Sequence, residues 1–267
     1  ESMEILKDPS SLAIFGVRGA NGVIIITTKK AKEGQTLVNI NTSFGFKKVV
    51  DKVKLVNGSQ FKELYNEQLA NQKDDPFDYT GWDANTDWQD EIFQTAFITN
   101  NNISITGASP KHSFYLGVGY SYEQGNIEHE KFSKVTINAS NDYKITDFLK
   151  VGFQFNGARM LPADSKQVLN ALRATPIAPV YNNEYGLYTA LPEFQKAQIN
   201  NPMVDVELKA NTTKAENYRA SGNIYGEVDF LKHFTFKAMF SMDYASNNGR
   251  TYTPIVKVYD AAVNGGI

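Results

Sequence analysis

Few residues of this chain have the types and spacing that catalysis or metal binding requires. The segment Asp83-Ala84-Asn85-Thr86-Asp87 has the Asp-x-Asn-x-Asp spacing of a calcium-binding loop. Such a loop needs glycine at its sixth position and a bidentate glutamate at its twelfth, where this chain has Trp88 and Gln94. We therefore interpret the segment as a polar surface turn rather than a metal site.

The three histidines, His112, His129 and His233, fall on separate turns or loops, and no second ligand follows them at helical or hairpin spacing. We expect them to be solvated. The sequence also contains no nucleophile elbow, no Ser/His/Asp constellation and no phosphate-binding loop. These observations predict a protein that is not an enzyme and that carries no metal and no cofactor.

A loop in the second half of the chain has residue types suited to ligand binding. Its aromatic side chains offer stacking surfaces and its amides offer hydrogen bonds, as sugar or peptide ligands need. The residues are Tyr181, Asn182, Asn183, Tyr185 and Tyr188. The alternative is an aromatic-rich loop that packs on itself or on a neighbouring protein.

A second candidate lies near the start of the chain, where Gly16, Gly19 and Gly22 are evenly spaced around Arg18 and Asn21. Glycine allows a positive φ or a close approach of two backbones, so this spacing predicts a compact, strained element. The preceding Pro-Ser-Ser (9–11) suits a turn or helix cap, and 12–15 could form one helical turn. The apolar run 23–26 predicts a strand buried on both sides.

Arg18 is charged within an otherwise small and apolar segment. Burying an unpaired charge costs several kcal/mol, so we expect Arg18 to meet a carboxylate or backbone carbonyls. Glu227 and Asp229 are candidate partners. The alternative is a solvated arginine on a loop.

The elements that must position these residues are mostly strands. Seven segments alternate apolar and polar residues over about ten positions each, the length that a tilted strand needs to cross a bilayer. They are 36–46, 101–107, 113–122, 134–142, 149–156, 218–230 and 234–244. Two helices are predicted between them, one from the capping signal Asn57-Gly58-Ser59-Gln60 and one over 165–174.

The connections between these strands alternate in length. Those at 47–100 and 157–216 are long and 123–131 is of medium length, whereas 108–112, 143–147 and 231–233 are short. Bacterial barrels place short turns on the periplasmic side and long loops outside. The alternation therefore predicts that the chain near Gly34 lies on the periplasmic side.

Composition excludes some functions. The net charge of −2 and the pI near 6.0 give no basic surface for nucleic acid. The mean hydropathy of −0.38, with no apolar run approaching about 18 residues, predicts no transmembrane helix. The 14 Tyr and 17 Phe suit a lipid-facing band with interfacial girdles. The first residue, Glu1, and the last, Ile267, lead us to expect an internal segment of a longer polypeptide.

The segment 6–30 resembles the end of the plug domain of a TonB-dependent outer-membrane transporter of the SusC/RagA type, found in Bacteroidetes. The resemblance rests on a Leu-Lys-Asp start, a Phe-Gly-Val-Arg-Gly-Ala-Asn-Gly-Val core and an Ile-Thr-Thr-Lys-Lys end. The segments 86–93 and 171–182 are also similar to that type.

This resemblance implies an all-β fold: a transmembrane antiparallel β-barrel of about 22 strands, preceded by an N-terminal plug domain. Residues 1–34 would be the C-terminal part of the plug, with Gly16, Arg18, Gly19, Asn21 and Gly22 as its signature. Residues 35–267 would form the first seven or so strands, with long extracellular loops at 47–100 and 157–216.

The implied function is import of oligosaccharides, glycans or peptides across the outer membrane. A SusD-like lipoprotein would capture substrate outside, and the TonB-ExbB-ExbD complex would act on the plug through a part that precedes Glu1. Outer-membrane lipid is an expected partner and nucleic acid is not. One alternative is a siderophore-type receptor of the same architecture, and another is a soluble β-rich carbohydrate-binding module.

Overall fold

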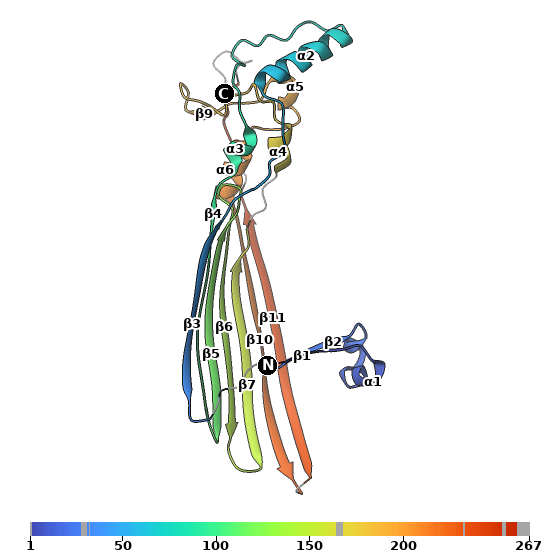
Figure 1. The fold of residues 1–267 in the computed structure, drawn as a ribbon, viewed down its shortest axis with the longest axis vertical. Coiled ribbons are helices and arrows are strands. Elements are labelled where there is room, and N and C mark those ends of the chain that lie inside the picture. The colour runs from blue at the N-terminus through green and yellow to red at the C-terminus, as the bar shows by residue number, and fades with distance from the viewer. Residues whose placement is uncertain are drawn as a thin grey trace.

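The computed structural model describes residues 2–27, 31, 33–163, 168–231, 233–252 and 255–260. Its main body is an antiparallel sheet of seven strands in the order β11-β10-β7-β6-β5-β4-β3 (Figure 1). The strands are β3 (Thr36–Lys47), β4 (Ala96–Ser109), β5 (His112–Gln124), β6 (Lys131–Lys144), β7 (Leu149–Leu161), β10 (Thr213–Phe230) and β11 (Phe234–Thr251). In the described part of the chain the sheet is open, with β3 and β11 as its edges.

The register collects the apolar residues of all seven strands on one face. One row across the strands contains Ile40, Ile103, Val118 and Ile137. The intervening residues Asn39, Ser104, Gly117 and Asn138 form the matching row on the other face. Ile40 is 70% exposed and Phe240 on β11 is 67% exposed, so no described element covers the apolar face.

The apolar residues form a diagonal band across the sheet. On β3 the band occupies 38–46, whereas on β11 it occupies 234–244. Following the register from Val38 across the sheet leads to Met242, near the upper end of the band on β11. The band therefore shifts along the strands as it crosses the sheet.

The strands are longer than the alternating pattern predicts. β4 begins at Ala96 rather than at 101, β10 begins at Thr213 rather than at 218, and β11 continues to Thr251. In β10 and β11 the extra ladder includes the opposed pair Lys214 and Arg250. In β10 and β11 the prediction of strand ends was wrong because the apolar residues stop before the hydrogen-bonded ladder does.

The connections at the two ends of the sheet differ in length. At one end β4 joins β5 through 110–111, β6 joins β7 through 145–148, and β10 joins β11 through 231–233. At the other end the connections are 48–95, 125–130 and 162–212. These three segments gather above the sheet in Figure 1, and we call them together the loop cap.

The loop cap contains most of the helices. They are α2 (Gly58–Gln72), α3 (Trp88–Ile92), α4 (Val168–Arg173), α5 (Glu193–Lys196) and α6 (Pro202–Thr212), with a hairpin of β8 (Tyr181–Asn182) and β9 (Leu187–Tyr188). The capping box predicted for α2 is confirmed, because Asn57 and Gln60 cap each other's backbone N–H groups. The helix predicted over 165–174 is α4, and 165–167 lie outside the described residues.

The hydrophobic core lies in the loop cap and not on the sheet. It includes both tryptophans of the chain, Trp82 and Trp88, and the segment 174–178 is buried throughout. The remaining buried members are Ile92, Ile127, Ala171, Leu191, Ile199, Met203 and Val206. The long connections thus fold into a unit with its own core.

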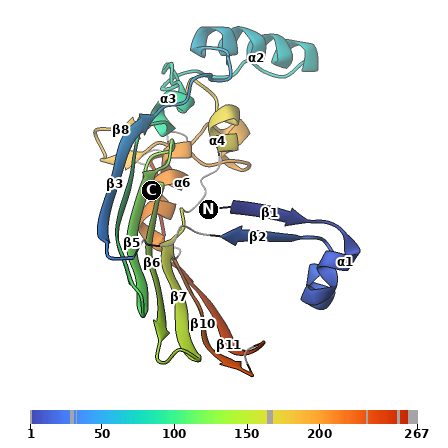
Figure 2. The same cartoon turned by 60° about the horizontal axis from the view of Figure 1, so that its bottom comes forward.

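The N-terminal segment forms a small separate element. β1 (Ser2–Leu6) pairs with β2 (Val23–Thr27), and between them lie α1 (Pro9–Leu12) and the 3-10 helix η1 (Ala13–Gly19). Figure 2 shows this element on the concave side of the sheet. The strand expected at 23–26 forms, but the expectation that it is buried was wrong, since Ile24 is 61% exposed. Its only strand neighbour among the described residues is β1.

Helix α1 begins at Pro9, earlier than the turn expected at 12–15. The Asp8 side chain caps it by accepting hydrogen bonds from the backbone N–H groups of Ser10 (3.1 Å) and Ser11 (3.2 Å). Within the described parts of the chain, no helix is both long enough and apolar enough to cross a membrane.

Candidate functional site

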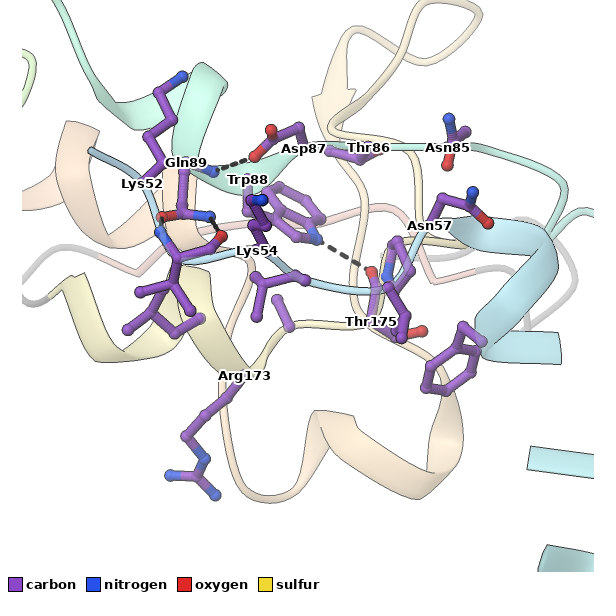
Figure 3. A pocket seen from close by; sticks show the side chains of 17 residues that line it. Lys52, Lys54, Asn57, Asn85, Thr86, Asp87, Trp88, Gln89, Arg173 and Thr175 are labelled. Carbon is purple, nitrogen blue, oxygen red and sulfur yellow. Dashed lines mark hydrogen bonds between the residues drawn. The ribbon is translucent and has the colours of Figure 1, made fainter. Parts of the chain in front are cut away.

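Segments from the two long connections pair directly in the loop cap. The indole Nε1 of Trp88 donates to the backbone oxygen of Thr175 at 2.9 Å (Figure 3). The Thr86 hydroxyl donates to the backbone oxygen of Ala178 at 2.7 Å. The Thr86 backbone N–H donates to Pro176 at 2.8 Å. The segment 83–87 lies at the surface as expected, with Asp83, Asn85 and Asp87 exposed, and it also joins the two loops. The sequence could not indicate this because the partners are about 90 residues away.

Two of the three side chains that suggested a calcium loop, Asn85 and Asp87, accept hydrogen bonds within the loop cap. Asn85 Oδ1 accepts a hydrogen bond from the Gly58 N–H at 2.7 Å, at the start of α2. The Asp87 side chain caps α3 by accepting from the N–H groups of Gln89 and Asp90. Asn85 and Asp87 therefore position two helices.

Gln89 fixes the chain that leads into α2. It is buried, and its side-chain amide both accepts from the Val53 N–H (3.0 Å) and donates to the Val53 carbonyl (2.8 Å). Beside it, Lys52 pairs with Asp90, and this hydrogen bond lowers the pKa of Asp90 from its usual value. The segment 52–57 is thus held against α3.

A cavity of about 610 Å³ lies where these segments meet. Its lining mixes the apolar Trp88 and Leu55 with the cationic Lys54 and the amides of Asn57 and Asn85 (Figure 3). Small-ligand pockets span about 300–1,000 Å³ and combine apolar walls with a few polar groups. This cavity therefore has the size and lining of a subsite for part of a polar ligand.

The structure brings together all five residues of the loop singled out for ligand binding. We call the segment 181–188 the tyrosine hairpin. The ring of Tyr181 meets that of Tyr188 edge-on at 5.3 Å, and Asn182 Oδ1 accepts from the Tyr185 N–H at 3.1 Å within the turn that carries Asn183. Tyr181 and Tyr185 are 42% and 47% exposed, whereas Tyr188 packs against the core, where burial raises its pKa.

Two residues that the sequence did not mark hold the tyrosine hairpin in place. Asn201, which is buried, donates to the backbone oxygens of Val180 and Thr189, both at 2.9 Å. The ring of Tyr259 stacks on Tyr185 at 5.0 Å, and its backbone pairs with the chain after Tyr188. Neither residue follows a local pattern that would have predicted this role. The tyrosine hairpin is thus anchored by Asn201 and Tyr259, and it exposes the rings of Tyr181 and Tyr185 together with Asn183.

The glycines near the start adopt the geometry that their spacing predicts. Gly16 has φ 59° and Gly22 has φ 98°, and both values favour glycine. A Cβ at Gly19 would lie 3.2 Å from the Leu12 backbone oxygen. Asn21 is exposed in the turn before β2. Backbone geometry therefore explains the spacing of the three glycines.

The side chain of Arg18 lies outside the described part of the structure. The carboxylates considered as its partners both have other contacts. Glu227 Oε2 lies 3.6 Å from Lys237 Nζ, and the Asp229 carboxylate accepts a hydrogen bond from the Thr235 hydroxyl. Both contacts connect β10 to β11.

Two of the three histidines are not simply solvated, which corrects the expectation. His129 Nε2 lies 2.7 Å from Glu207 Oε1 on α6, and His112 Nε2 lies 2.9 Å from Asn141 Nδ2. Glu128 joins His129 and Glu207 in a group whose ligand-type atoms lie within 4.8 Å of one another. The partner of His129 is 78 residues away, so local spacing could not reveal it. The contact ties the turn 125–130 to α6.

Comparison with known proteins places this architecture in a family, although no protein-family model matches the chain. Over 93% of its length the chain superposes on part of a structure described as the RagAB peptide transporter. The TM-score is 0.75, the identity is 20%, and the match covers 32% of that chain. A structure of the RagAB peptide importer in the open-open state gives a TM-score of 0.71 at 21% identity. These similarities establish the fold.

Sequence relatives are closer. The chain is 30% identical over 99% of its length to TonB-dependent receptor SusC of Bacteroides thetaiotaomicron, and covers 28% of that receptor. It belongs to the SusC/RagA type of TonB-dependent receptors. The TonB-dependent receptor P3 of Formosa agariphila is also 30% identical over 99% of the chain, with 26% of its length covered. The chain thus spans about a quarter of the length of the curated relatives it matches.

Membership in this family confirms the resemblance found in the sequence. SusC/RagA-type receptors reside in the bacterial outer membrane and are transporters rather than enzymes. In the described part of the chain, the apolar face of the sheet carries no second protein layer. The core of this receptor segment is correspondingly confined to the loop cap.

Proposed function

We propose that this chain is part of a transporter that imports oligosaccharides or peptides across the bacterial outer membrane, driven through TonB. Residues 1–34 form the end of the plug, and 35–267 form the first seven strands and the extracellular loops of a barrel of about 22 strands. The observation that carries the proposal is the diagonal, exposed apolar band of seven strands below a packed loop cap.

The orientation follows from the two ends of the sheet. Short turns join the strands at one end and the loop cap closes the other, and outer-membrane barrels have short periplasmic turns and long extracellular loops. The Gly34 N–H donates to the Ala108 carbonyl at 2.9 Å, beside the short β4–β5 turn. This contact supports entry of the plug segment from the periplasmic side.

Within the loop cap, the tyrosine hairpin is the part that meets substrate. Tyr181 and Tyr185 are exposed, and their rings can stack on a sugar or a peptide side chain while Asn183 supplies hydrogen bonds. The solved relatives are described as the RagAB peptide importer in open-open and closed-closed states. This supports an import cycle in which a SusD-like lipoprotein closes over the loop cap.

The test uses the full-length receptor in a strain that lacks its own copy. Uptake of labelled peptide and oligosaccharide pools is compared for wild type, the double variant Tyr181→Ala/Tyr185→Ala, and Leu64→Ala, a control on the exposed side of α2. We expect the double variant to lose uptake at low substrate concentration and to recover at high concentration, because it removes binding surface only. The control should match wild type.

Two results would redirect the assignment. Uptake of an iron chelate instead of peptides or oligosaccharides, without any copurifying lipoprotein, would establish the siderophore-type receptor. Recovery of the native protein in the aqueous phase of a detergent partition would establish the soluble carbohydrate-binding module. The exposed Phe240 and Ile40 oppose that second alternative, because a soluble sheet would bury them.

A further inference from the structure

A second cavity of about 610 Å³ lies on the sheet itself, at the end nearest the loop cap. It is formed by the upper parts of β5, β6, β7, β10 and β11. We call it the basic cleft, because four cationic side chains and one carboxylate line it together with two tyrosines. They are Lys131, Arg159, Lys214, Arg250, Glu216, Tyr120 and Tyr122.

The register places the basic cleft on the lipid-facing side. Val135, Arg159 and Tyr218 are direct neighbours across β6, β7 and β10. Val135 belongs to the apolar face, because it pairs with Tyr120 in the row next to Val118 and Ile137. Residues two or four positions apart on a strand share a face, so Lys131, Lys214 and Arg250 point to the same side.

Tyrosines mark the lower edge of the basic cleft. Tyr120, Tyr122, Tyr218 and Tyr244 lie on the lipid-facing side where the apolar band ends. Rings of tyrosine in outer-membrane barrels sit at the boundary between hydrocarbon and headgroups. The cationic side chains lie just beyond them along the strands, at the level of lipid headgroups.

The positive charge of the basic cleft is not balanced within the protein. Lys214 and Arg250 are directly opposite each other on β10 and β11, and like charges in that position destabilise a sheet. Arg159 is paired with Glu216. In the described ranges of the chain, Lys131, Lys214 and Arg250 have no anionic partner.

We propose that the basic cleft binds the phosphorylated headgroup of an outer-leaflet lipid. A phosphate between Lys214 and Arg250 relieves their repulsion and accepts hydrogen bonds from both. The cleft opens directly onto the apolar band at Val135, so its occupant needs an acyl chain next to its anionic group. A membrane lipid has both parts, and a soluble anion has only one. The proposal rests on the membrane orientation given under Proposed function.

The experiment measures lipid binding by the full-length receptor with native mass spectrometry. The probes are lipid A with its phosphates, dephosphorylated lipid A and inorganic phosphate. The test variant is Lys131→Ser/Lys214→Ser/Arg250→Ser. The matched control is Lys111→Ser/Lys144→Ser/Lys150→Ser, which removes the same charge at the other end of the sheet.

Wild type and the control should prefer phosphorylated lipid A. The test variant should bind it about 100-fold more weakly, since each cation near a membrane surface contributes roughly fivefold. Nutrient uptake should not change, because the cleft faces away from the lumen. If the transport assignment fails, the lipid-binding measurement can therefore still be interpreted.

Three results overturn the proposal. The test variant could bind phosphorylated lipid A as tightly as wild type does, or wild type could bind dephosphorylated lipid A as tightly as the phosphorylated form. Inorganic phosphate could also displace bound lipid A when both are present at the same concentration. If the triple variant does not fold, the single variant Lys214→Ser replaces it in the binding measurement. It removes one side of the like-charge pair, so it should fold and still bind phosphorylated lipid A about fivefold more weakly.

Discussion

Replacing Trp88 tests whether the two long loops form one cooperative unit. Trp88 is 2% exposed, and its indole N–H donates to the Thr175 backbone oxygen. Trp88→Ala should destabilise the loop cap by about 3–5 kcal/mol, the usual cost of deleting a buried tryptophan. Trp88→Phe keeps most of the apolar burial and leaves the Thr175 carbonyl unpaired, which costs about 1–3 kcal/mol.

Hydrogen exchange of the full-length receptor measures these costs locally. A cost of about 3 kcal/mol speeds exchange through local opening by about 100-fold. We expect this acceleration for Trp88→Ala in peptides covering both 84–93 and 171–180, and a smaller one for Trp88→Phe. Strand peptides covering 113–122 should keep wild-type rates. Leu64→Ala, at a position that is 55% exposed, should change neither region.

The decisive comparison is between the two cap regions. If exchange accelerates only in 84–93 while 171–180 keeps its protection, the loops are independent and the shared core does not couple them. If the strands lose protection equally, the loop cap is not a separate unit. Either result would refute the reasoning from the buried contacts.

Other predictions test the sheet, the tyrosine hairpin and the pH dependence of the loop cap. Phe240→Lys puts a cation in the apolar band of β11 and should lower the free energy of unfolding in lipid by about 2–4 kcal/mol. Ser241→Lys, on the opposite face of the sheet, should lower it much less. Urea titrations in vesicles compare the two variants, and equal losses would contradict the lipid-facing assignment. Asn201→Ala leaves the Thr189 carbonyl unpaired and removes one of the two donors to the Val180 carbonyl, which keeps the Thr189 N–H. It should raise hydrogen exchange over 180–190 by about tenfold, and unchanged exchange would show that Asn201 is not the anchor. The hydrogen bond from Lys52 lowers the pKa of Asp90, so the stability that Asp90 adds is present above its unfolded pKa of about 4 and is lost as the pH falls through its folded pKa. The melting temperature of Asp90→Asn should therefore lie below that of wild type at neutral pH and converge with it in acid; a constant difference would contradict this.

The sheet was largely predictable because strand faces are encoded locally. Alternation located all seven strands, from 36–46 to 234–244. It misplaced their ends where the outer face changes from apolar to charged, as at Lys214 and Arg250. The backbone ladder continues there without an apolar signal, so hydrophobic periodicity cannot report it.

The loop cap was less predictable because its core is shared between distant segments. Only α2, with its capping box at Asn57, carries a complete local signal. Helices α3 and α5 have five and four residues, too few for a period to show. The five ligand-binding candidates around Tyr185 were chosen by residue type. Their arrangement depends on Asn201, which lies 12 residues after Thr189, and on Tyr259, which lies farther along the chain.

The joining of the two loops has a consequence for the order in which this chain folds. The contacts of Thr86 with Ala178 and of Trp88 with Thr175 close loops of 92 and 87 residues, and strands β4 to β7 lie between their ends. Closing these loops before the strands pair would lower the chain entropy with no compensating contacts. A slip of one residue in any of these ladders would reverse a strand's faces and displace the loops that it carries. Closure of the Trp88 contact is therefore a late step that succeeds only after four strands have paired in register.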